Sequence, residues 1–348
     1  MSHDPHRPTA RRRSAGQVKA PTLADVAKVA GVSPITVSRT LNQPEIVRPA
    51  LREKVFRAVQ ITGYVPAMLT AGEPDKRSRL ISVLVPTIAN SIFADTVQAL
   101  IDTLTEAGHE TLIGLTNYSA EREEKLLDAV LRRRPDAIVL TGTLHTKASR
   151  QRLSRSGIPI VETWDLGDKP LDMLVGFSHE AVGDAVARYL LDKGHQRFGL
   201  VTLDDPRGRR RSDSLIATLR LNGIEAIEQV LLPVPATVSL GRLGLQHFLE
   251  QDALPGVLVC SSDTLAHGIL EEATERGLRV PDDLAVMGFG DLSSAAHLHP
   301  ALSTVSVNGG EIGIRAARAL LRRLDEADQE PQKVRIDTGF KIIERDSA

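Results

Sequence analysis

The sequence predicts an N-terminal all-α headpiece with a helix-turn-helix, followed by an α/β body of two doubly wound, parallel-sheet lobes. Two observations lead to this expectation. Three short helical patterns occupy the chain up to about Gly63, and from Leu80 onward short apolar runs alternate with amphipathic segments. The chain has 348 residues, which suffices for two or three domains at roughly 100–200 residues each.

Short apolar runs mark the expected strands of the body. They are LISVLV at 80–85, TLI at 111–113, AIVL at 137–140, IPIV at 158–161, FGLV at 198–201, VLV at 257–259 and LAVM at 284–287. Amphipathic segments such as 119–133 and 179–193 lie between them. Continuous apolar strands separated by helices are typical of parallel sheets covered on both faces. There are too many strands for one small sheet, so we expect two lobes with a ligand cleft at the carboxyl ends of the strands.

The charge is distributed unevenly along the chain. Residues 1–79 carry 14 Lys and Arg against 6 Asp and Glu, whereas the remaining residues carry 29 against 38. A basic N-terminal part attached to an acidic body indicates that one end meets a polyanion.

The composition excludes several classes of protein. Aromatic residues make up 3% of the chain, so the core must consist of Leu, Val, Ile and Ala. The single cysteine, Cys260, excludes a disulfide framework and a cysteine-based zinc site, and it fits a reducing cytosol. Within the apolar run at 256–260 we interpret it as a small buried hydrophobe. We expect no membrane span, because no apolar stretch reaches the roughly 20 residues required, and no signal peptide.

Four segments follow from these changes in composition. Residues 1–20 are polar, basic and rich in Pro, Ser and Arg, and we expect a disordered basic tail. The headpiece spans 21–64, and a hinge or linker that contains GEPDKRS at 72–78 spans 65–79. The two-lobed body spans 80–345.

Residues 22–42 carry the local signals of two short helices joined by a turn. Thr22 caps the first helix, and Asp25 completes an acidic variant of the capping box. Gly31 supplies a tight turn, Ser33 caps the second helix, and Pro34 takes the first helical position, where a missing N–H costs nothing. A third helix is expected over about 49–62. This spacing fits a helix-turn-helix, whose second helix enters the major groove of DNA, and equally an ordinary three-helix bundle.

The identity of the residues favours the helix-turn-helix. The run TLADVAKVAGVSPITVSRTLN at 22–42 resembles the headpiece of LacI/GalR-family repressors, and the resemblance extends to REKV at 52–55 and GYVP at 63–66. It implies that Pro34, Ile35 and Arg39 face base edges. Arg39 is the natural guanine reader because its guanidinium can pair with O6 and N7 together, and a phosphate contact is its alternative role. The other DNA-binding residues that we expect are Thr22, Ser33, Thr36, Ser38, Asn42 and Tyr64, with Ser33, Thr36 and Ser38 on phosphates.

The linker departs from the family pattern. In the family, a helix that follows the Tyr-x-Pro motif folds on DNA and pushes a leucine into the minor groove. The aligned residue here is Glu73, next to Pro74, and a carboxylate cannot act as an apolar wedge and is repelled by phosphates. Two alternatives stay open: a shorter helix with Met68 or Leu69 as the wedge, or a hinge that bends DNA little.

The resemblance covers nearly all of residues 21–345 and implies a body similar to periplasmic sugar-binding proteins. PTIANSIF at 86–93, SSDTLA at 261–266 and GFGD at 288–291 look like loops that line the effector cleft, and VGFSHE at 175–180 looks like the crossover between lobes. The body is therefore expected to bind a small polar effector. The effector-binding residues that we expect are Asn90, Phe93, Thr141, His145, Trp164, Phe177, Arg211, Ser262, Asp263 and Gly290.

The charges at two of these positions favour an acid over a neutral sugar. Arg211 aligns with the arginine that grips the effector in the family, and a bidentate arginine suits a carboxylate better than it suits hydroxyls. Sugar-binding members usually carry Asp at the position of Gly290, and an Asp there would repel an anion. At least one of Arg209 and Arg210 is expected to be merely solvated.

The segments LTGTLHT at 140–146, VETWD at 161–165 and LDMLVGF at 171–177 look like those of the family's gluconate-operon repressors. Gluconate is therefore the leading effector, and 2-ketogluconate, 6-phosphogluconate and a neutral sugar are the alternatives. Trp164, with Phe177, either flanks the ligand or packs in the core. His145 either bonds to the ligand or lies on the surface, and Glu162 is not expected to touch the ligand.

The sequence lacks the common enzyme motifs: a P-loop, a Gly-x-Gly-x-x-Gly after a strand, a Gly-x-Ser-x-Gly elbow and a His-Glu-x-x-His. We expect no enzymatic activity, no cofactor and no metal. The rival classes are a stand-alone sugar-acid-binding protein, which would lack a headpiece, and a sugar-converting enzyme, which would turn over its ligand. The favoured function is a cytoplasmic, nucleoid-associated repressor that binds a pseudo-palindromic double-stranded DNA operator as a homodimer.

Overall fold

The computed structural model describes residues 22–62, 64, 78–88, 91–251, 254–326 and 332–348, apart from the side chains of Asn42 and Ser91. The chain divides into two compact units, with the boundary between Lys76 and Arg77. The expected basic tail at 1–20 and nearly all of the expected linker, including Met68, Leu69 and Glu73, lie outside the described residues.

The first unit contains the expected three helices, α1 (Leu23–Ala30), α2 (Pro34–Asn42) and α3 (Pro49–Thr62), with a short 3-10 turn η1 (Pro44–Ile46). Their starts confirm the local prediction. Thr22 and Asp25 form a reciprocal capping box, Gly31 ends α1 at a φ of 66°, and the Ser33 side chain accepts the Thr36 N–H at the start of α2. The Thr22 and Ser33 side chains each pair a backbone donor that the helix itself leaves unsatisfied.

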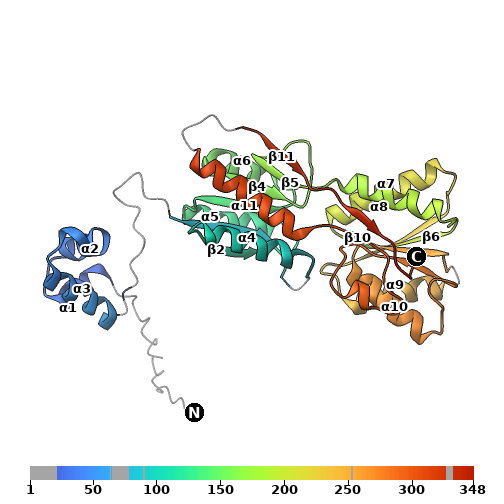
Figure 1. Ribbon diagram of the computed structural model, residues 1–348, viewed down its shortest axis with the longest axis horizontal. Coiled ribbons are helices and arrows are strands. Elements are labelled where there is room, and N and C mark those ends of the chain that lie inside the picture. The colour runs from blue at the N-terminus through green and yellow to red at the C-terminus, as the bar shows by residue number, and fades with distance from the viewer. Residues whose placement is uncertain (1–21, 63, 65–77, 89–90, 252–253, 327–331) are drawn as a thin grey trace, which may run out of the picture. The chain divides into compact units, whose positions relative to one another are not determined.

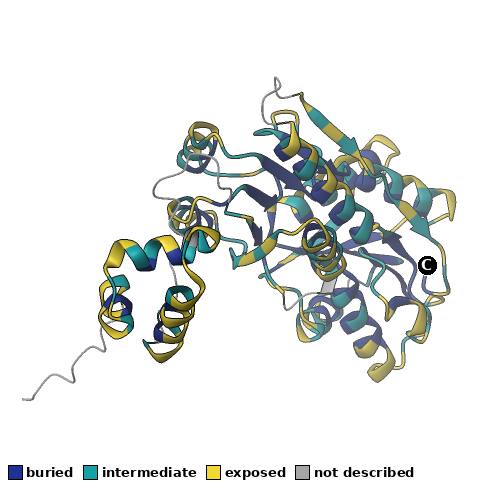
Figure 2. Cartoon of the chain, turned by 60° about the vertical axis from the view of Figure 1, so that its left-hand side comes forward, coloured by how far each residue is buried: buried dark blue, intermediate teal, exposed yellow. Residues whose placement is uncertain are grey.

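The core of this unit is small and aliphatic. Val26, Val37 and Val55, one from each helix, are fully buried, and Ala27 and Ala58 fill the space between them. Figure 2 shows this pattern as dark blue on the inner faces of the helices and yellow on the outer faces.

The first lobe of the body has a six-stranded, wholly parallel sheet in the order β11-β5-β4-β3-β1-β2. The strands are β1 (Leu80–Val85), β2 (Glu110–Leu115), β3 (Ala137–Thr141), β4 (Ile160–Thr163), β5 (Met173–Gly176) and β11 (Val334–Asp337). The helices are α4 (Ala94–Glu106), α5 (Ala120–Arg132), α6 (Lys147–Ser156) and α11 (Gly309–Asp325), with a short 3-10 turn η2 (Ser91–Phe93) (Figure 1).

Side chains of this sheet alternate between two cores. Val83 and Val139 pack with α4 and α11, whereas Leu84, Ile138 and Leu140 pack with α5 and α6. Since both faces are covered, the strands carry apolar residues at successive positions. The lobe is therefore doubly wound, as predicted.

The second lobe repeats this plan with a four-stranded parallel sheet in the order β7-β6-β8-β9. The strands are β6 (Phe198–Leu203), β7 (Ile227–Leu232), β8 (Val257–Cys260) and β9 (Ala285–Met287). The helices are α7 (His179–Asp192), α8 (Pro206–Leu221), α9 (Val238–Glu250) and α10 (Asp263–Glu275), with a 3-10 turn η3 (Ala295–His297). Cys260 is buried in the core between this sheet and helices α9 and α10, as expected of a small hydrophobe.

Three segments cross between the lobes within the described part of the body. One joins β5 to α7, a second joins β10 (Thr304–Ser306) to α11, and a third joins β11 to β12 (Lys341–Ile343). Strands β10 and β12 pair antiparallel. Two of the crossings are bonded to each other, because Thr338 N and Thr338 Oγ1 both donate to the Gly176 carbonyl, at 2.8 and 3.1 Å.

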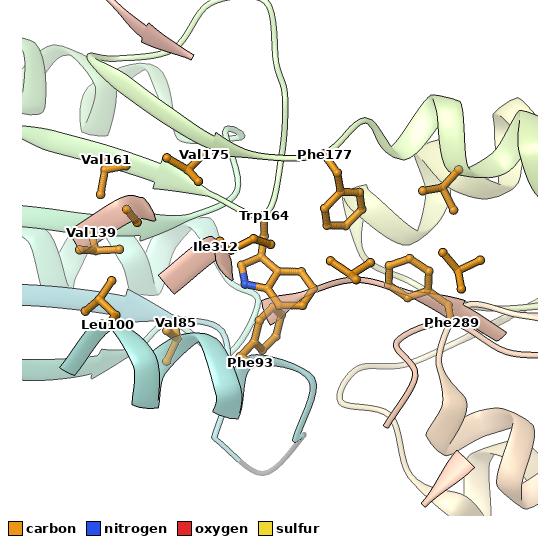
Figure 3. Packing of buried hydrophobic residues seen from close by; sticks show 14 of the residues in the cluster. Val85, Phe93, Leu100, Val139, Val161, Trp164, Val175, Phe177, Phe289 and Ile312 are labelled. Atoms are coloured by element: carbon orange, nitrogen blue, oxygen red, sulfur yellow. The ribbon is translucent and has the colours of Figure 1, made fainter. Parts of the chain in front are cut away.

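One apolar cluster runs through both lobes. Figure 3 shows Val139, Val161 and Leu100 of the first lobe leading to Trp164, and Phe177 and Phe289 continuing into the second lobe. The two lobes thus share a core at their junction.

Several elements differ from the sequence-based expectation. Strands β5, β7, β10, β11 and β12 were not predicted: β5 is the segment interpreted as the crossover, and the others are short or carry polar residues. Ser78 and Arg79, assigned to the linker, are bonded to the body through the Asp136 carboxylate. The body also continues past 345, since Ser347 is fully buried and its Oγ donates to the Val286 carbonyl at 2.6 Å.

Helices α7 and α8 approach closely because Gly183 has no side chain. A Cβ at Gly183 would lie directly against the Arg211 carbonyl oxygen and within 2.9 Å of Leu215 N. We therefore expect Gly183→Ala to lower the free energy of unfolding by about 1–3 kcal/mol through overpacking.

Urea denaturation of the two variants Gly183→Ala and Gly310→Ala measures this effect. Gly310 is the matched control, because a Cβ there meets only Asn308 Oδ1 at 3.6 Å. The control should be neutral or slightly stabilised, since alanine favours a helix over glycine. Equal stabilities of the two variants would show that the close approach at Gly183 has no energetic importance.

Candidate DNA-reading surface and effector cleft

The N-terminal end of α2 presents a polar, solvent-facing surface. Ser33, Pro34 and Arg39 are exposed, Ile35 is 67% exposed, and Thr36 and Ser38 are half-buried. Val37 and Thr40 face the core instead. The six residues expected on base edges and phosphates therefore lie on the accessible side of the helix.

The remaining residues of the expected DNA-binding set have structural roles or lie partly outside the described residues. Thr22 forms the capping box with Asp25, and Tyr64 packs against the core of the headpiece. Asn42 ends α2, and its side chain is not among the described ones.

The body contains a cleft at the carboxyl ends of the strands, where ligands bind in open α/β sheets. A cavity of about 40 Å³ lies between the lobes. It is lined by Ile92, Phe93, Tyr118 and Trp164 of the first lobe and by His179, Leu203, Asp205, Arg207, Arg211, Ser261, Ser262 and Phe289 on the side of the second. A second cavity of about 110 Å³ adjoins it, with Tyr118 and Arg207 in both linings, and includes Thr141, Thr143 and Asp165.

Aromatic rings form one wall of the cleft. Trp164 stands edge-on to Phe93 at 5.0 Å and to Phe177 at 5.9 Å between ring centroids. Its Nε1 donates to Thr96 Oγ1 at 3.0 Å. Trp164 has a φ of 63°, in the left-handed region that a bulky residue rarely adopts. Such strain is held only where the surroundings determine it, and it gathers at functional sites.

Arg211 and His179 form a fixed pair behind this wall. His179 Nε2 lies 2.9 Å from the Trp164 carbonyl, which can only accept, so Nε2 carries the proton and Nδ1 accepts from Arg211 NH1 at 3.1 Å. Burial, followed by the charges of Arg211, Arg207 and Arg210, holds the pKa of His179 well below its usual value. Arg211 NH2 donates to the Ser261 carbonyl, and the guanidinium lies 3.7 Å from the Phe289 ring centroid.

An ion pair joins the lobes beside the cleft. Arg210 of α8 binds Asp165 of the first lobe with two bonds of 2.7 and 2.9 Å, and its Nε donates to Glu180 at 2.7 Å. Asp165 is completely buried and also accepts from Thr143 Oγ1 at 2.6 Å. Of the two arginines considered for a merely solvated role, Arg210 is thus engaged, and Arg209 is an exposed residue paired with Asp204.

His145 lies inside the first lobe. Its side chain is 1% exposed and lies between Glu123 Oε1 at 2.7 Å and Glu162 Oε1 at 3.2 Å. Burial alone would lower the pKa of His145, but the hydrogen bonds to the two carboxylates outweigh it and raise the pKa to about 9. Of the two alternatives for His145, the surface position was wrong, because the two carboxylates offer partners for both ring nitrogens inside the fold. His145 also lines neither cavity.

The other expected effector residues divide into two groups. Phe93, Trp164, Arg211 and Ser262 line the first cavity and Thr141 the second. Phe177, Asp263 and Gly290 do not line either, and Asn90 lies outside the described residues.

Asp263 does not line the cavity but holds neighbouring segments by hydrogen bonds. It is 2% exposed, and it accepts bonds from Thr304 Oγ1 at 2.6 Å and Leu292 N at 2.8 Å. Burial raises its pKa to about 6. Its oxygens thus hold the start of β10 and the loop after β9, which carries Phe289.

The sequence reasoning missed several lining residues, among them Tyr118, Asp205 and Arg207. Tyr118 follows β2 with a φ of 59°, and Asn117 beside it has a φ of 51°. The position of this pair at the carboxyl end of a predicted strand was a signal that could have identified Tyr118. Burial raises the pKa of Tyr118 to about 12, so the phenol is a neutral donor and acceptor in the cleft.

Comparison with known proteins agrees with this architecture. Residues 22–67 match the family model described as bacterial regulatory proteins, lacI family, and residues 187–348 match that of a periplasmic binding protein-like domain. A helix-turn-helix headpiece joined to such a body defines a DNA-binding transcription regulator.

Full-length relatives support the same assignment. The chain is 36% identical to the HTH-type transcriptional regulator GntR of Pseudomonas aeruginosa, over 94% of this chain and 95% of that protein. It is 30% identical to GntR of Escherichia coli, over 93% and 97% of the two chains. It also matches the crystal structure of a LacI-family regulator from Silicibacter pomeroyi at 31% identity and a TM-score of 0.83, over 94% and 99% of the two chains. The chain belongs to the LacI family of transcriptional regulators, and it is not an enzyme.

The buried His145 cluster should make stability depend on pH. Since the pKa of His145 is raised in the fold, from 6.5 to about 9, the stabilisation is fully present below pH 6.5 and is lost as the pH rises through about 9. We expect a loss on the order of 2–3 kcal/mol between pH 6 and pH 10 in wild type that is absent in His145→Gln.

Urea denaturation at several pH values measures this loss. His267→Gln is the control, because the ion pair of His267 with Glu271 is on the surface and contributes little. A pH profile of His145→Gln that parallels wild type would contradict the assignment.

Proposed function

We propose that the protein is a repressor of genes for sugar-acid catabolism, and that a small effector in the chemical class of gluconate releases it from its operator. The observation that carries this proposal is the cleft between the lobes, in which arginines and hydroxyl groups face an aromatic wall. A carboxylate suits the arginines and a polyol chain suits the hydroxyls. The resemblance of segments 140–146, 161–165 and 171–177 to gluconate-operon repressors supports gluconate in particular.

We assign effector contacts to Phe93, Trp164, Arg211 and Ser262, and to Thr141 in the adjoining cavity. The side chains are presented by both lobes, so a bound effector would strengthen one arrangement of the lobes over others. Differential contacts of this kind are what a ligand needs to shift a conformational equilibrium.

The absence of a side chain at Gly290 also favours an anion. Its φ is 130°, and a Cβ there would lie 3.3 Å from Ile92 Cδ1. An Asp at this position would be strained and would bring a negative charge to the cleft. 2-Ketogluconate and 6-phosphogluconate are the alternative acids, and a neutral sugar is less well supported.

On the DNA side we propose that two headpieces of a homodimer read two half-sites of a pseudo-palindromic operator. A feature of the first lobe favours a dimer. Strand β2 is at the edge of its sheet, and its apolar residues Leu112 and Ile113 are 38% and 40% exposed. An exposed apolar edge strand offers a surface that a second copy can cover.

A gel-shift titration tests the proposed induction. Gluconate should weaken operator binding by about 5–150-fold, which corresponds to a coupling of roughly 1–3 kcal/mol. Glucose at the same concentrations is the control. Binding of gluconate by calorimetry with unchanged operator affinity would refute induction by this ligand.

The role of Arg39 is tested with Arg39→Ala. Loss of a bidentate guanine contact should cost roughly 1–3 kcal/mol in operator affinity and relax the preference at one base pair. Binding to a library of operator variants measures both effects. An affinity that falls equally for all sequences would identify Arg39 as a phosphate contact instead.

A further inference from the structure

Arg207 occupies a special position in the cleft, because it lines both cavities where they meet. It begins in the first turn of α8 in the second lobe, and its side chain reaches the first lobe. There the guanidinium carbon lies 5.2 Å from the Phe93 ring centroid, and NH1 is 4.0 Å from where a Cβ of Gly142 would be.

The guanidinium of Arg207 is incompletely paired. Its Nε lies 3.6 Å from Asp205 Oδ1, which is an ion pair but longer than a hydrogen bond. Its NH1 is buried and has no hydrogen-bond partner within the described residues. A buried donor left unpaired is unfavourable, and more so when it is charged. An anionic ligand atom in the cavity would remove this cost.

The neighbouring arginines are engaged by the protein itself. Arg211 NH1 donates to His179 Nδ1 and Arg211 NH2 donates to the Ser261 carbonyl, and the guanidinium stacks on Phe289. Arg210 is bound by Asp165 and Glu180. Of the three, Arg207 therefore has the terminal nitrogen best placed to receive an anion.

The surrounding groups limit the charge of that anion. Asp205 is buried, and its Oδ1 accepts from the backbone N–H groups of Arg207 and Gly208 at 3.1 and 3.2 Å. With His179 held neutral, the charged groups in the lining of the first cavity are two cations, Arg207 and Arg211, and one anion, Asp205. This balance of charges fits a ligand with one negative charge, such as a monocarboxylate, better than a phosphorylated acid.

We propose that Arg207 binds the carboxylate of the effector and determines the preference for an acid over a neutral sugar. Arg211 is a second lining residue, whose terminal nitrogens are held by His179 and the Ser261 carbonyl. This inference rests on the proposed function and adds a residue and a charge to it. The contact bridges the lobes, since the same guanidinium lies against Phe93 of the first lobe.

The test compares gluconate with gluconamide, which carries a neutral amide in place of the carboxylate. Binding is followed by calorimetry and by the fluorescence of Trp164, the single tryptophan, which lies in the same cavity. Four variants are compared with wild type: Arg207→Gln, Arg207→Lys, Arg211→Gln and Arg209→Gln. Arg209 is the matched control because it is an exposed residue of the same helix.

We expect wild type to prefer gluconate and Arg207→Gln to weaken gluconate binding by about 10- to 100-fold, with gluconamide binding changed less than about threefold. Arg207→Lys should recover part of the preference, because it restores the charge without the planar fork. Arg209→Gln should match wild type, and Arg211→Gln should weaken both ligands together.

Two results would overturn the inference while leaving the proposed function intact. One is an Arg207→Gln variant that keeps the wild-type preference for gluconate. The other is a variant with a wild-type thermal melt that loses both ligands equally, which would mean that Arg207 only shapes the cavity. If wild type binds no sugar acid, the proposed effector is wrong, and the same variants are then tested with other monocarboxylates. Failure of wild type to bind any carboxylate would overturn the assignment of Arg207 as well.

Discussion

The contact on which the body depends is the row of rings formed by Phe93, Trp164, Phe177 and Phe289. The chain has seven Phe, three Tyr and one Trp, and apart from the rings its core consists mainly of aliphatic residues. Four of these scarce large rings meet at the junction of the lobes, with centroids 5.0–6.2 Å apart. Aromatic side chains bury more area than any other and prefer edge-to-face contact at such distances. The row therefore joins the cores of the two lobes, and three of its rings, Phe93, Trp164 and Phe289, also line the cleft.

The polar groups of the cleft are arranged around this wall. The carbonyl of Trp164 fixes the protonated nitrogen of His179, and the other nitrogen of His179 fixes Arg211, which in turn covers Phe289. Because His179 stays neutral, it can accept from a guanidinium in a region crowded with positive charge. Trp164 and Tyr118, the two residues with left-handed backbone conformations in the lining of the first cavity, are strained where the direction of the side chain matters for a ligand.

The residue pattern was sufficient to predict the elements that obey simple rules. The caps at Thr22 and Ser33 are local, and β1, β3, β6 and β8 are continuous apolar runs, so both could be predicted from neighbours in the sequence. Strand β7 carries Glu228 and Gln229, and β5 lies in a segment that also looks like a crossover, so their pairing depends on contacts far along the chain. The cleft residues were also hard to predict, because their roles depend on contacts between distant parts of the chain. Arg207, Arg209, Arg210 and Arg211 are equivalent in sequence, and only the packing of α8 makes one exposed, one an ion pair between lobes and two part of the cavity.

The bond from Thr338 to the Gly176 carbonyl has a mechanical consequence. It fastens two of the three connections between the lobes side by side, and Gly176 itself packs against the backbone of Asp165, which receives Arg210 from the opposite lobe. Two of these connections are therefore held together at this place, so a change in the angle between the lobes has to bend both of them here. The Arg210–Asp165 ion pair also spans the two lobes, so opening of the cleft would have to break it.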